Sequence, residues 1–429
     1  MKLNFRYGFF IDVIVSIILL LIIFPIKFYV LFLDSSRATY FLVVVSSIFF
    51  VNKFQLYSRG DFYVFASFLF LFLYSVFVIT INGAVDLTFI RISFEFLLKY
   101  FIALFFLAYF LNGWLGYKFD RLVKVLLFAF FIQATFIYLM LIFPSFQSFI
   151  FDYIRAGGLG VEIEGAWRLR KVGLTGWAAY DMAVNMVLPL FILPLISIKK
   201  RWFFTLYIYF LGAAFISGRT AFLAIPIIYF ISVFIYLKYS YTPKSVRNVL
   251  LILPFCCFVV FSVVAFLLPV LKVDGLDILI EWILELFVNF IDGDIGTSST
   301  NKLFTMFFVP EVLTFLFGDG YYVTSEGGYY MGTDVGYLRL ILFFGVVGVL
   351  SFMACFSLFF IRLTKKLKFY ACGPGTELYV FSFFIFLLIV NVKGSIFIDA
   401  IPSLSALFLI YNFLIVSKGM LDESLTRGR

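Results

Sequence analysis

Four cationic side chains gather in a polar stretch that joins two apolar runs. They are Arg155, Arg168, Arg170 and Lys171. Guanidinium groups stay charged and bind phosphate oxygens through paired hydrogen bonds, so the cluster could hold a diphosphate. Two carboxylates of the same stretch, Glu162 and Glu164, lie close to these cations in the sequence, and the cations would then be available to a ligand only if the carboxylates do not neutralise them. The alternative is that the cations only form ion pairs with these two glutamates.

A second group of chemically capable residues lies between Leu316 and Leu340, a stretch rich in glycine and tyrosine. Glycine permits tight turns, and tyrosine offers a flat apolar face with a hydroxyl group, which suits a sugar or a membrane interface. Asp334 precedes a predicted helix and Arg339 lies in its first turns; Asp334 could also serve only as a cap. The predicted sugar contacts are Tyr321, Tyr322, Tyr329, Tyr330 and Asp319, although Asp319 could only shape the turn.

Charged residues also occur at three further places outside the basic loops. Arg219 occurs in the turn Ser-Gly-Arg-Thr, where small neighbours leave room for a ligand; it could instead anchor a helix end at the membrane surface. Arg91, Glu95 and Lys99 share one face of a predicted helix and can pair there, or line a cavity. Asp181 lies near one end of its apolar run and could face the same cavity.

The elements that must position these residues are membrane-spanning helices. The 429 residues are 64% hydrophobic and only 13% charged. Apolar runs of about 18 or more residues are typical of transmembrane helices. We predict an all-α, polytopic transmembrane helix bundle that forms a single membrane domain over residues 1–429. Its spans, about twelve in number, are expected near 9–31, 38–51, 62–81, 91–112, 122–143, 176–197, 202–217, 220–237, 249–271, 337–361, 376–393 and 400–417.

Lysine and arginine gather in every second loop between these spans, which indicates that these loops and both termini face the cytoplasm. This asymmetry also explains the net charge of +9 without a nucleic-acid partner. Two long loops, 144–175 and 272–336, are then on the opposite side, and loops of such length are usually functional or disordered. Short peripheral helices are expected in the second loop, an amphipathic one at 281–290 and an apolar run at 303–317 that Pro310 interrupts.

The chain contains no histidine, and its four cysteines form no Cys-x-x-Cys motif. A zinc site and a cysteine–histidine nucleophile are therefore not expected. We predict neither a metal nor a cofactor.

These motifs resemble those of the bacterial O-antigen polymerases, and more broadly the superfamily that they share with the O-antigen ligases. The resemblance rests on the number of spans and on the segments RLRKVGLTGWAAYDMA, ISGRTA, FGDGYY and TDVGYLRL, followed by Gly345 and Gly348. The matching motifs lie within about residues 160–350, and the arrangement of spans is similar over the whole chain. The ligase branch uses a histidine in its late periplasmic loop, so the lack of histidine here favours a polymerase.

The resemblance implies a glycosyltransferase of the bacterial inner membrane that joins undecaprenyl-diphosphate-linked oligosaccharides at the periplasmic face. A hydroxyl group of the acceptor would attack the anomeric carbon of the donor, and undecaprenyl diphosphate would leave. Arg168, Arg170, Lys171, Arg219 and Arg339 would stabilise the leaving group. Asp334, and after it Glu162, Glu164 or Asp319, would take the proton. Membrane lipids and a chain-length regulator are the further partners to consider. A lipid-linked oligosaccharide flippase and an O-antigen ligase are the alternatives.

Overall fold

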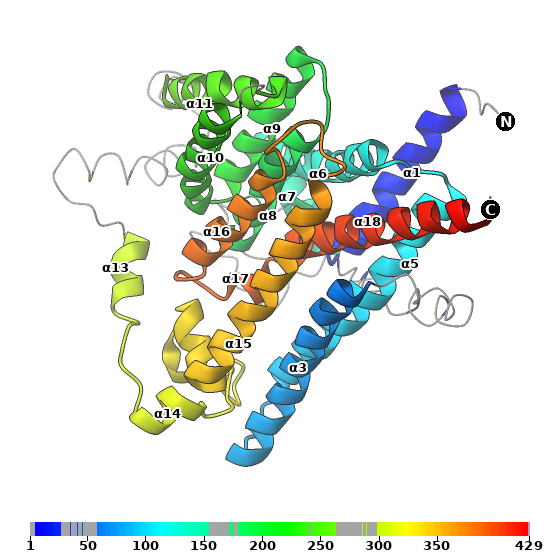
Figure 1. The fold of residues 1–429 in the computed structure, drawn as a ribbon. Coiled ribbons are helices and arrows are strands. Elements are labelled where there is room, and N and C mark those ends of the chain that lie inside the picture. Colours follow the sequence, from blue (N-terminus) through cyan, green and yellow to red (C-terminus); the bar gives the residue numbers. More distant parts are fainter. Residues whose placement is uncertain are drawn as a thin grey trace.

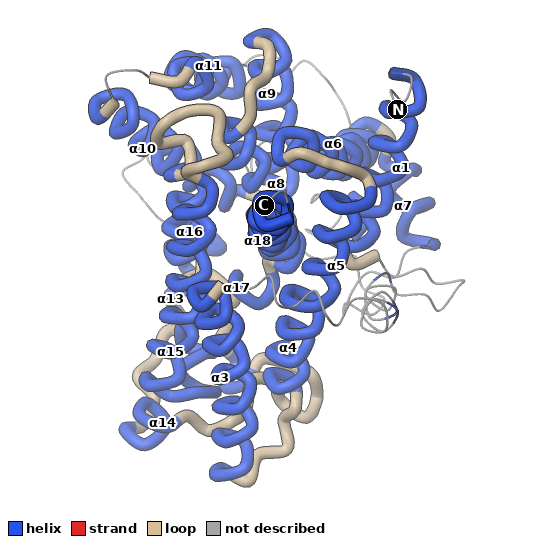
Figure 2. Tube along the Cα trace, turned by 45° about the vertical axis from the view of Figure 1, so that its right-hand side comes forward, coloured by secondary structure: helices blue, strands red, loops and turns tan. Residues whose placement is uncertain are grey.

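The computed structural model describes residues 5–26, 58–153, 171, 173–175, 179–239, 242–262 and 298–427, with isolated positions at 35, 41, 45, 285 and 289. Throughout these ranges the regular structure is helical, and the extended backbone pairs at one isolated bridge, between Val323 and Tyr329. Figures 1 and 2 show long helices packed side by side. The prediction of an all-α bundle is therefore confirmed for the described part of the chain.

The helices follow the apolar runs of the sequence closely. They are α1 (Phe5–Ile23), α3 (Arg59–Asn82), α4 (Thr88–Phe96), α5 (Leu104–Tyr109), α6 (Phe119–Ile142), α7 (Pro144–Tyr153), α8 (Ala179–Ile192), α9 (Lys200–Ser217), α10 (Ala224–Lys238), α11 (Lys244–Ser262), α13 (Ser298–Phe304), α14 (Val312–Phe317), α15 (Gly336–Leu367), α16 (Leu378–Val390), α17 (Ile396–Asp399) and α18 (Ile401–Arg427). Short π-helical turns connect α4 to α5 and extend α5 to Trp114.

Six continuous helical stretches in the described residues are long and apolar enough to cross a membrane. They are Arg59–Asn82, Thr88–Trp114, Phe119–Ile142, Arg219–Lys238, Gly336–Leu367 and Ile401–Gly419. Shorter apolar helices cover Gly8–Ile23, Asp181–Leu195 and Leu378–Val390. The chain is thus a polytopic helical membrane protein. The expected span at 38–51 and the second half of that at 249–271 lie outside the described residues, except for positions 41 and 45, so the number of spans stays a prediction.

The interior of the bundle is built from aromatic rings around α18. Phe408 of this helix stacks on Tyr100 and on Phe359, with ring centroids 4.4 Å and 3.9 Å apart. Figure 2 shows α18 end-on near the middle of the bundle, which agrees with its burial. The many phenylalanines of the sequence serve here as packing, because stacked and edge-to-face rings add to the stability gained from buried area.

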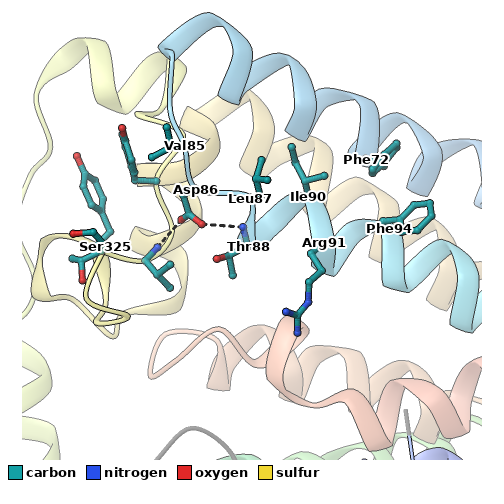
Figure 3. A pocket seen from close by; sticks show the side chains of 13 residues that line it. Phe72, Val85, Asp86, Leu87, Thr88, Ile90, Arg91, Phe94 and Ser325 are labelled. Atoms are coloured by element: carbon teal, nitrogen blue, oxygen red, sulfur yellow. Dashed lines mark hydrogen bonds between the residues drawn. The ribbon is translucent and has the colours of Figure 1, made fainter. Parts of the chain in front are cut away.

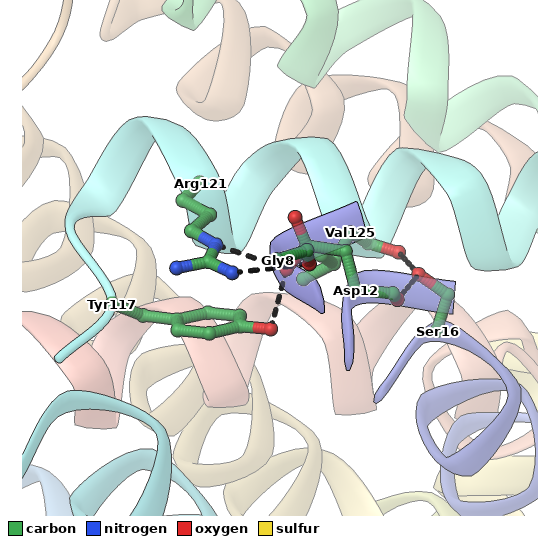
Figure 4. A network of polar contacts seen from close by, with 6 residues as sticks. All are labelled: Gly8, Asp12, Ser16, Tyr117, Arg121 and Val125. Carbon is green, nitrogen blue, oxygen red and sulfur yellow. Dashed lines mark hydrogen bonds and ion pairs between the residues drawn. The ribbon is translucent and has the colours of Figure 1, made fainter. Parts of the chain in front are cut away.

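Ionic contacts tie several basic segments together at one end of the bundle. Lys366, near the end of α15, lies 3.1 Å from Asp61 in the first turn of α3, and the hydroxyl of Tyr411 donates to the same carboxylate at 2.7 Å. Asp12 of α1 accepts hydrogen bonds from Arg121 and Tyr117 at 2.9 Å and 2.5 Å (Figure 4). These contacts join segments that the charge pattern assigned to one side of the membrane.

The end that carries the glycine- and tyrosine-rich stretch is formed by α3, α4, α14 and the start of α15 (Figure 1). α13 and α14 flank Pro310, so the predicted break in the run 303–317 is confirmed. The amphipathic helix expected at 281–290 lies outside the described residues except for Glu285 and Asn289, which are both helical. At Gly345 α15 is kinked, with φ +68°, and an added Cβ there would lie 2.3 Å from the carbonyl oxygen of Leu316. Only glycine permits this close packing of α14 on α15.

Candidate functional site

A buried aspartate fixes the loop that carries the tyrosines. α3 ends at Gly83, and α4 begins at Thr88. Between them, Asp86 accepts a hydrogen bond from the backbone N–H of Thr88 at 2.9 Å through one carboxylate oxygen. Its other oxygen accepts from the backbone N–H groups of Tyr322 and Val323 at 2.6 Å and 2.8 Å. Figure 3 draws Asp86 with its bond to Thr88. The segment 319–330, which we name the tyrosine loop, is therefore attached to the α3–α4 connection.

The four tyrosines of this loop form two pairs. Tyr321 and Tyr330 stack on each other with ring centroids 5.4 Å apart. Tyr322 and Tyr329 lie instead on either side of the Arg339 guanidinium group, which is 3.9 Å and 4.3 Å from the centroids of their rings. The loop thus uses Tyr322 and Tyr329 to contact Arg339, whereas Tyr321 and Tyr330 contact each other.

Asp319 has an internal role in the loop. One oxygen accepts from the hydroxyl of Thr314 at 2.7 Å, and the other accepts from the hydroxyl of Tyr330 at 3.1 Å. Its backbone N–H donates to the carbonyl oxygen of Leu342 at 2.7 Å. These bonds fit the interpretation that Asp319 shapes the turn. The contact of Asp319 with a sugar stays a prediction.

Arg339 is the most enclosed cation of this region, with 5% of its side chain exposed. The guanidinium lies 4.0 Å from the carboxylate of Asp334, and its Nε atom has no hydrogen-bond partner in the described part of the chain. A guanidinium between two aromatic faces is held by cation–π attraction while its N–H groups stay available at the ring edges. This arginine is therefore oriented by the rings and incompletely paired.

Asp334 is half-buried, and burial raises the pKa of its carboxyl group to about 6, against the opposing effects of Arg339 and Lys393. Burial also raises the pKa of Tyr329 to about 12, with Asp334 and Asp399 adding to the increase. A carboxyl group that titrates near neutral pH can accept a proton during a reaction and return it to water afterwards. The arrangement therefore offers a general base beside a fixed cation.

Lys393 and Asp399 belong to no motif in the sequence, and the structure brings them into electrostatic range of Asp334 and Tyr329, respectively. Asp181 also acts on Tyr329 and lines a small cavity together with Asp399. That it faces the cavity of the cationic site stays a prediction. Asp86 also belongs to no motif. Its position two residues before a helix start is a local signal for a turn, but no local signal points to its bonds with the distant tyrosine loop.

Lys171 and Arg219 form a second group. The Lys171 side chain is buried and donates to Oε1 of Gln147 at 2.5 Å, and burial lowers the pKa of its ammonium group. The hydroxyl of Ser217 donates to the carbonyl oxygen of Lys171 at 3.0 Å, so this lysine is attached to the turn that carries Arg219. Arg219 forms an ion pair with Glu285 and is 9% exposed. Arg219 and Arg339 were expected to serve one cavity; the structure gives each its own carboxylate partner.

The other predicted site residues, Arg155, Glu162, Glu164, Arg168 and Arg170, lie outside the described residues. Arg91 and Glu95 form the expected pair, at 3.1 Å on the surface of α4. In the described ranges, no group of three or more histidine, cysteine, aspartate or glutamate side chains is placed to hold a metal ion. Comparison of the chain with protein-family models, curated proteins and solved structures gave no match.

Proposed function

We propose that this protein is an O-antigen polymerase, a membrane glycosyltransferase that joins oligosaccharides carried on undecaprenyl diphosphate. One observation carries the proposal. Arg339 is buried between the rings of Tyr322 and Tyr329, beside the carboxyl group of Asp334, whose pKa is raised to about 6. A fixed, incompletely paired cation next to a base matches the two requirements of glycosyl transfer from a diphosphate: charge stabilisation and proton removal.

The proposed reaction forms one bond and breaks one. The hydroxyl oxygen of the acceptor sugar attacks the anomeric carbon of the donor, and its proton passes to the carboxylate of Asp334. The bond between the anomeric carbon and the diphosphate oxygen breaks, and the electron pair leaves with the diphosphate. Arg339 would stabilise the charge that develops on that oxygen, and its Nε–H group, which has no partner within the described residues, could donate to it.

Lys171 and Arg219 would contribute further positive charge on the diphosphate. Lys171 is buried, the side chain of Arg219 is only 9% exposed, and Ser217 couples the backbone of the lysine to the turn that holds the arginine. For Arg219 this requires that the diphosphate replace Glu285 as its ionic partner. The cations Arg155, Arg168 and Arg170 would belong to the same diphosphate site.

The topology that accompanies the proposal has about twelve spans. Both termini would lie in the cytoplasm and the Arg339 group at the periplasmic face of the bacterial inner membrane. The distribution of basic residues supports it. Lys366 and Arg121 lie at the helix ends that the charge pattern assigned to the cytoplasm, whereas Arg339 lies at the other end of α15 from Lys366. A chain-length regulator would bind from the membrane or the periplasm.

The test is the glycan profile of a strain that lacks this protein. A polymerase defect leaves a single repeat unit on the lipid core, whereas a flippase or ligase defect leaves none. Complementation with Arg339→Ala should fail to restore long chains, and Arg59→Ala should restore them. Arg59 is an exposed arginine at the opposite end of the bundle, so it controls for the loss of an arginine in general. Long chains formed by a normally expressed Arg339→Ala protein would refute the role of this residue.

A further inference from the structure

A groove of about 1160 Å³ lies between α3, the start of α4 and the tyrosine loop. Figure 3 shows it with the side chains that line it. Its volume is slightly above the usual range for small-molecule sites, which is about 300–1000 Å³. One wall comes from the two helices and their connection, and it consists mainly of Phe72, Val85, Leu87, Ile90 and Phe94.

The lining changes in character along the groove. Between the helices, Phe72 and Phe94 pack together with ring centroids 5.7 Å apart. At the loop end, hydroxyl groups of Thr88, Thr324 and Ser325 line it beside the Tyr321–Tyr330 ring pair. An apolar trough with a polar end matches an amphipathic molecule better than it matches a sugar or a peptide helix.

The groove continues the lipid-facing surface of the protein. Val85, Leu87 and Phe94 are 83%, 62% and 46% exposed, and they lie on or beside helical stretches able to cross a membrane. Large exposed apolar side chains at such positions contact hydrocarbon chains, because the bilayer and not water surrounds a membrane-spanning helix. A lipid chain can therefore enter the groove sideways from the bilayer.

The groove lining includes an arginine, Arg91, whose present ionic partner could be replaced by a ligand. Arg91, in the first turn of α4, lines the groove with a side chain that is 78% exposed. It pairs with Glu95 at 3.1 Å on the surface, and exposed pairs of this kind contribute little to stability. A phosphate can offer the guanidinium a bidentate, doubly charged partner instead.

The tyrosine loop is also the wall between the groove and the Arg339 group. Tyr321, Val323 and Tyr330 face the groove, while their neighbours Tyr322 and Tyr329 flank Arg339. This alternation follows from the extended backbone of the loop, in which successive side chains point to opposite faces. A molecule in the groove is thus separated from Arg339 by the thickness of one loop.

We propose that this groove binds a lipid whose head group carries phosphate, with the chain between α3 and α4 and the phosphate at Arg91. The occupant is one of the two polyprenyl-diphosphate-linked substrates rather than a bulk phospholipid, because the loop that lines the groove also positions Arg339. This assignment rests on the proposed function, which requires two lipid-linked molecules to meet. The groove then holds one lipid-linked substrate while the Arg339 group acts on the leaving diphosphate of the other.

The experiment is a binding titration of the full-length protein, purified in detergent, by native mass spectrometry. The probe is undecaprenyl diphosphate, and phosphatidylglycerol is the competitor. Val85→Trp places an indole in the groove at an exposed position. Val347→Trp is the matched control, since Val347 is 54% exposed on α15 and does not line the groove. We expect Val85→Trp to weaken binding about tenfold, and Val347→Trp to leave it unchanged.

Two charge variants test the phosphate contact. Arg91→Gln should weaken undecaprenyl diphosphate binding by about three- to tenfold, the range for loss of one charged hydrogen-bonding partner. Glu95→Gln, which removes the competing carboxylate of the pair, should keep or strengthen it. If Arg91 served only to stabilise α4, both variants would lower stability alike and neither would alter binding.

Unchanged binding in Val85→Trp would overturn the groove as the lipid site. If phosphatidylglycerol displaced undecaprenyl diphosphate at equal concentration, the groove would be a site for ordinary bilayer lipids, and the proposal would also be overturned. Arg339→Ala separates this inference from the proposed function, because it should lose polymer formation while the groove still binds lipid. Polymer formation by Arg339→Ala would refute the catalytic assignment and leave the binding result standing.

Discussion

Replacement of Asp334 by asparagine should stabilise the folded protein at pH 8 while it abolishes polymer formation. Burial raises the pKa of this carboxyl group from 3.8 to about 6. The folded state therefore holds the proton more tightly than the unfolded chain does. Stability is then greatest below about pH 4, falls as pH rises to about 6, and is constant above it. This is the opposite of the behaviour of a carboxylate that a salt bridge stabilises.

The magnitude follows from the same values. Each pKa unit is worth about 1.4 kcal/mol, so the difference between 3.8 and about 6 corresponds to about 3 kcal/mol. The attraction of Arg339 at 4.0 Å is already included, because it lowers the pKa that burial raises. An asparagine side chain at this position would keep the shape of the carboxylate without its charge. With 26% of the Asp334 side chain exposed, we expect about 1–3 kcal/mol of stabilisation at pH 8 and none near pH 4.

The assay is thermal unfolding of the detergent-solubilised protein at pH 4.5, 6 and 8, followed by tryptophan fluorescence. The midpoint of Asp334→Asn should exceed that of the unchanged protein by a margin that grows from pH 4.5 to about 6 and is constant above it. Asp120→Asn is the control, since Asp120 is 49% exposed in a surface pair and should show little pH-dependent difference. Polymer formation by the unchanged protein should rise with pH through about 6, because a base must be ionised.

The result that refutes this reasoning is a loss of stability in Asp334→Asn at pH 8. Breaking a buried ion pair by removing one partner costs about 3–5 kcal/mol. A loss of that size would mean that Asp334 is the structural counter-ion of Arg339 and not a destabilised group retained for chemistry. The sign of the change therefore decides between the two roles.

Three further substitutions test the scaffold of the site. Asp86→Ala leaves the N–H groups of Tyr322 and Val323 without their acceptor, and it should cost about 2–4 kcal/mol of stability and abolish polymer formation. Faster hydrogen exchange of the tyrosine loop in the variant would show the loss of these two bonds. Gly345→Ala should cost at least about 2 kcal/mol in thermal unfolding, since φ is +68° there and a backbone oxygen is in the way. Asp61→Ala removes the acceptor of three side chains, Ser58, Lys366 and Tyr411, and should cost about 3–5 kcal/mol; a smaller loss would mean that water can replace the carboxylate as their acceptor.

The positions of the helices could be predicted from the sequence because a membrane span must satisfy its own backbone hydrogen bonds. The run 62–81 became α3 (Arg59–Asn82), and the run 337–361 became the first part of α15 (Gly336–Leu367). The kink at Gly345 could not be predicted in the same way. It depends on the carbonyl oxygen of Leu316, which reaches this position only when α14 packs on α15.

For the site, both charged residues, Asp334 and Arg339, could be singled out from the sequence, but the rings that surround the arginine could not. Asp334 and Arg339 are five residues apart around a helix start, so their proximity follows from local geometry. The rings that enclose Arg339 belong to a loop whose conformation depends on Asp86, which is 236 residues before Tyr322. A contact over that separation leaves no periodicity or spacing in the sequence. Neither the enclosure of Arg339 by Tyr322 and Tyr329 nor the stacking of Tyr321 on Tyr330 could therefore be predicted.

The electrostatics of the α15 start favour an anion as the missing partner of Arg339. The first N–H groups of a helix carry partial positive charge, and at Val335, the N-cap position, no side chain accepts from them. Arg339 adds a full charge within the second turn. The carboxyl group within its reach, Asp334, titrates at about 6, so near that pH it supplies only part of a negative charge. A diphosphate would complete the pairing, and its departure as a more highly charged leaving group would be favoured by the same field.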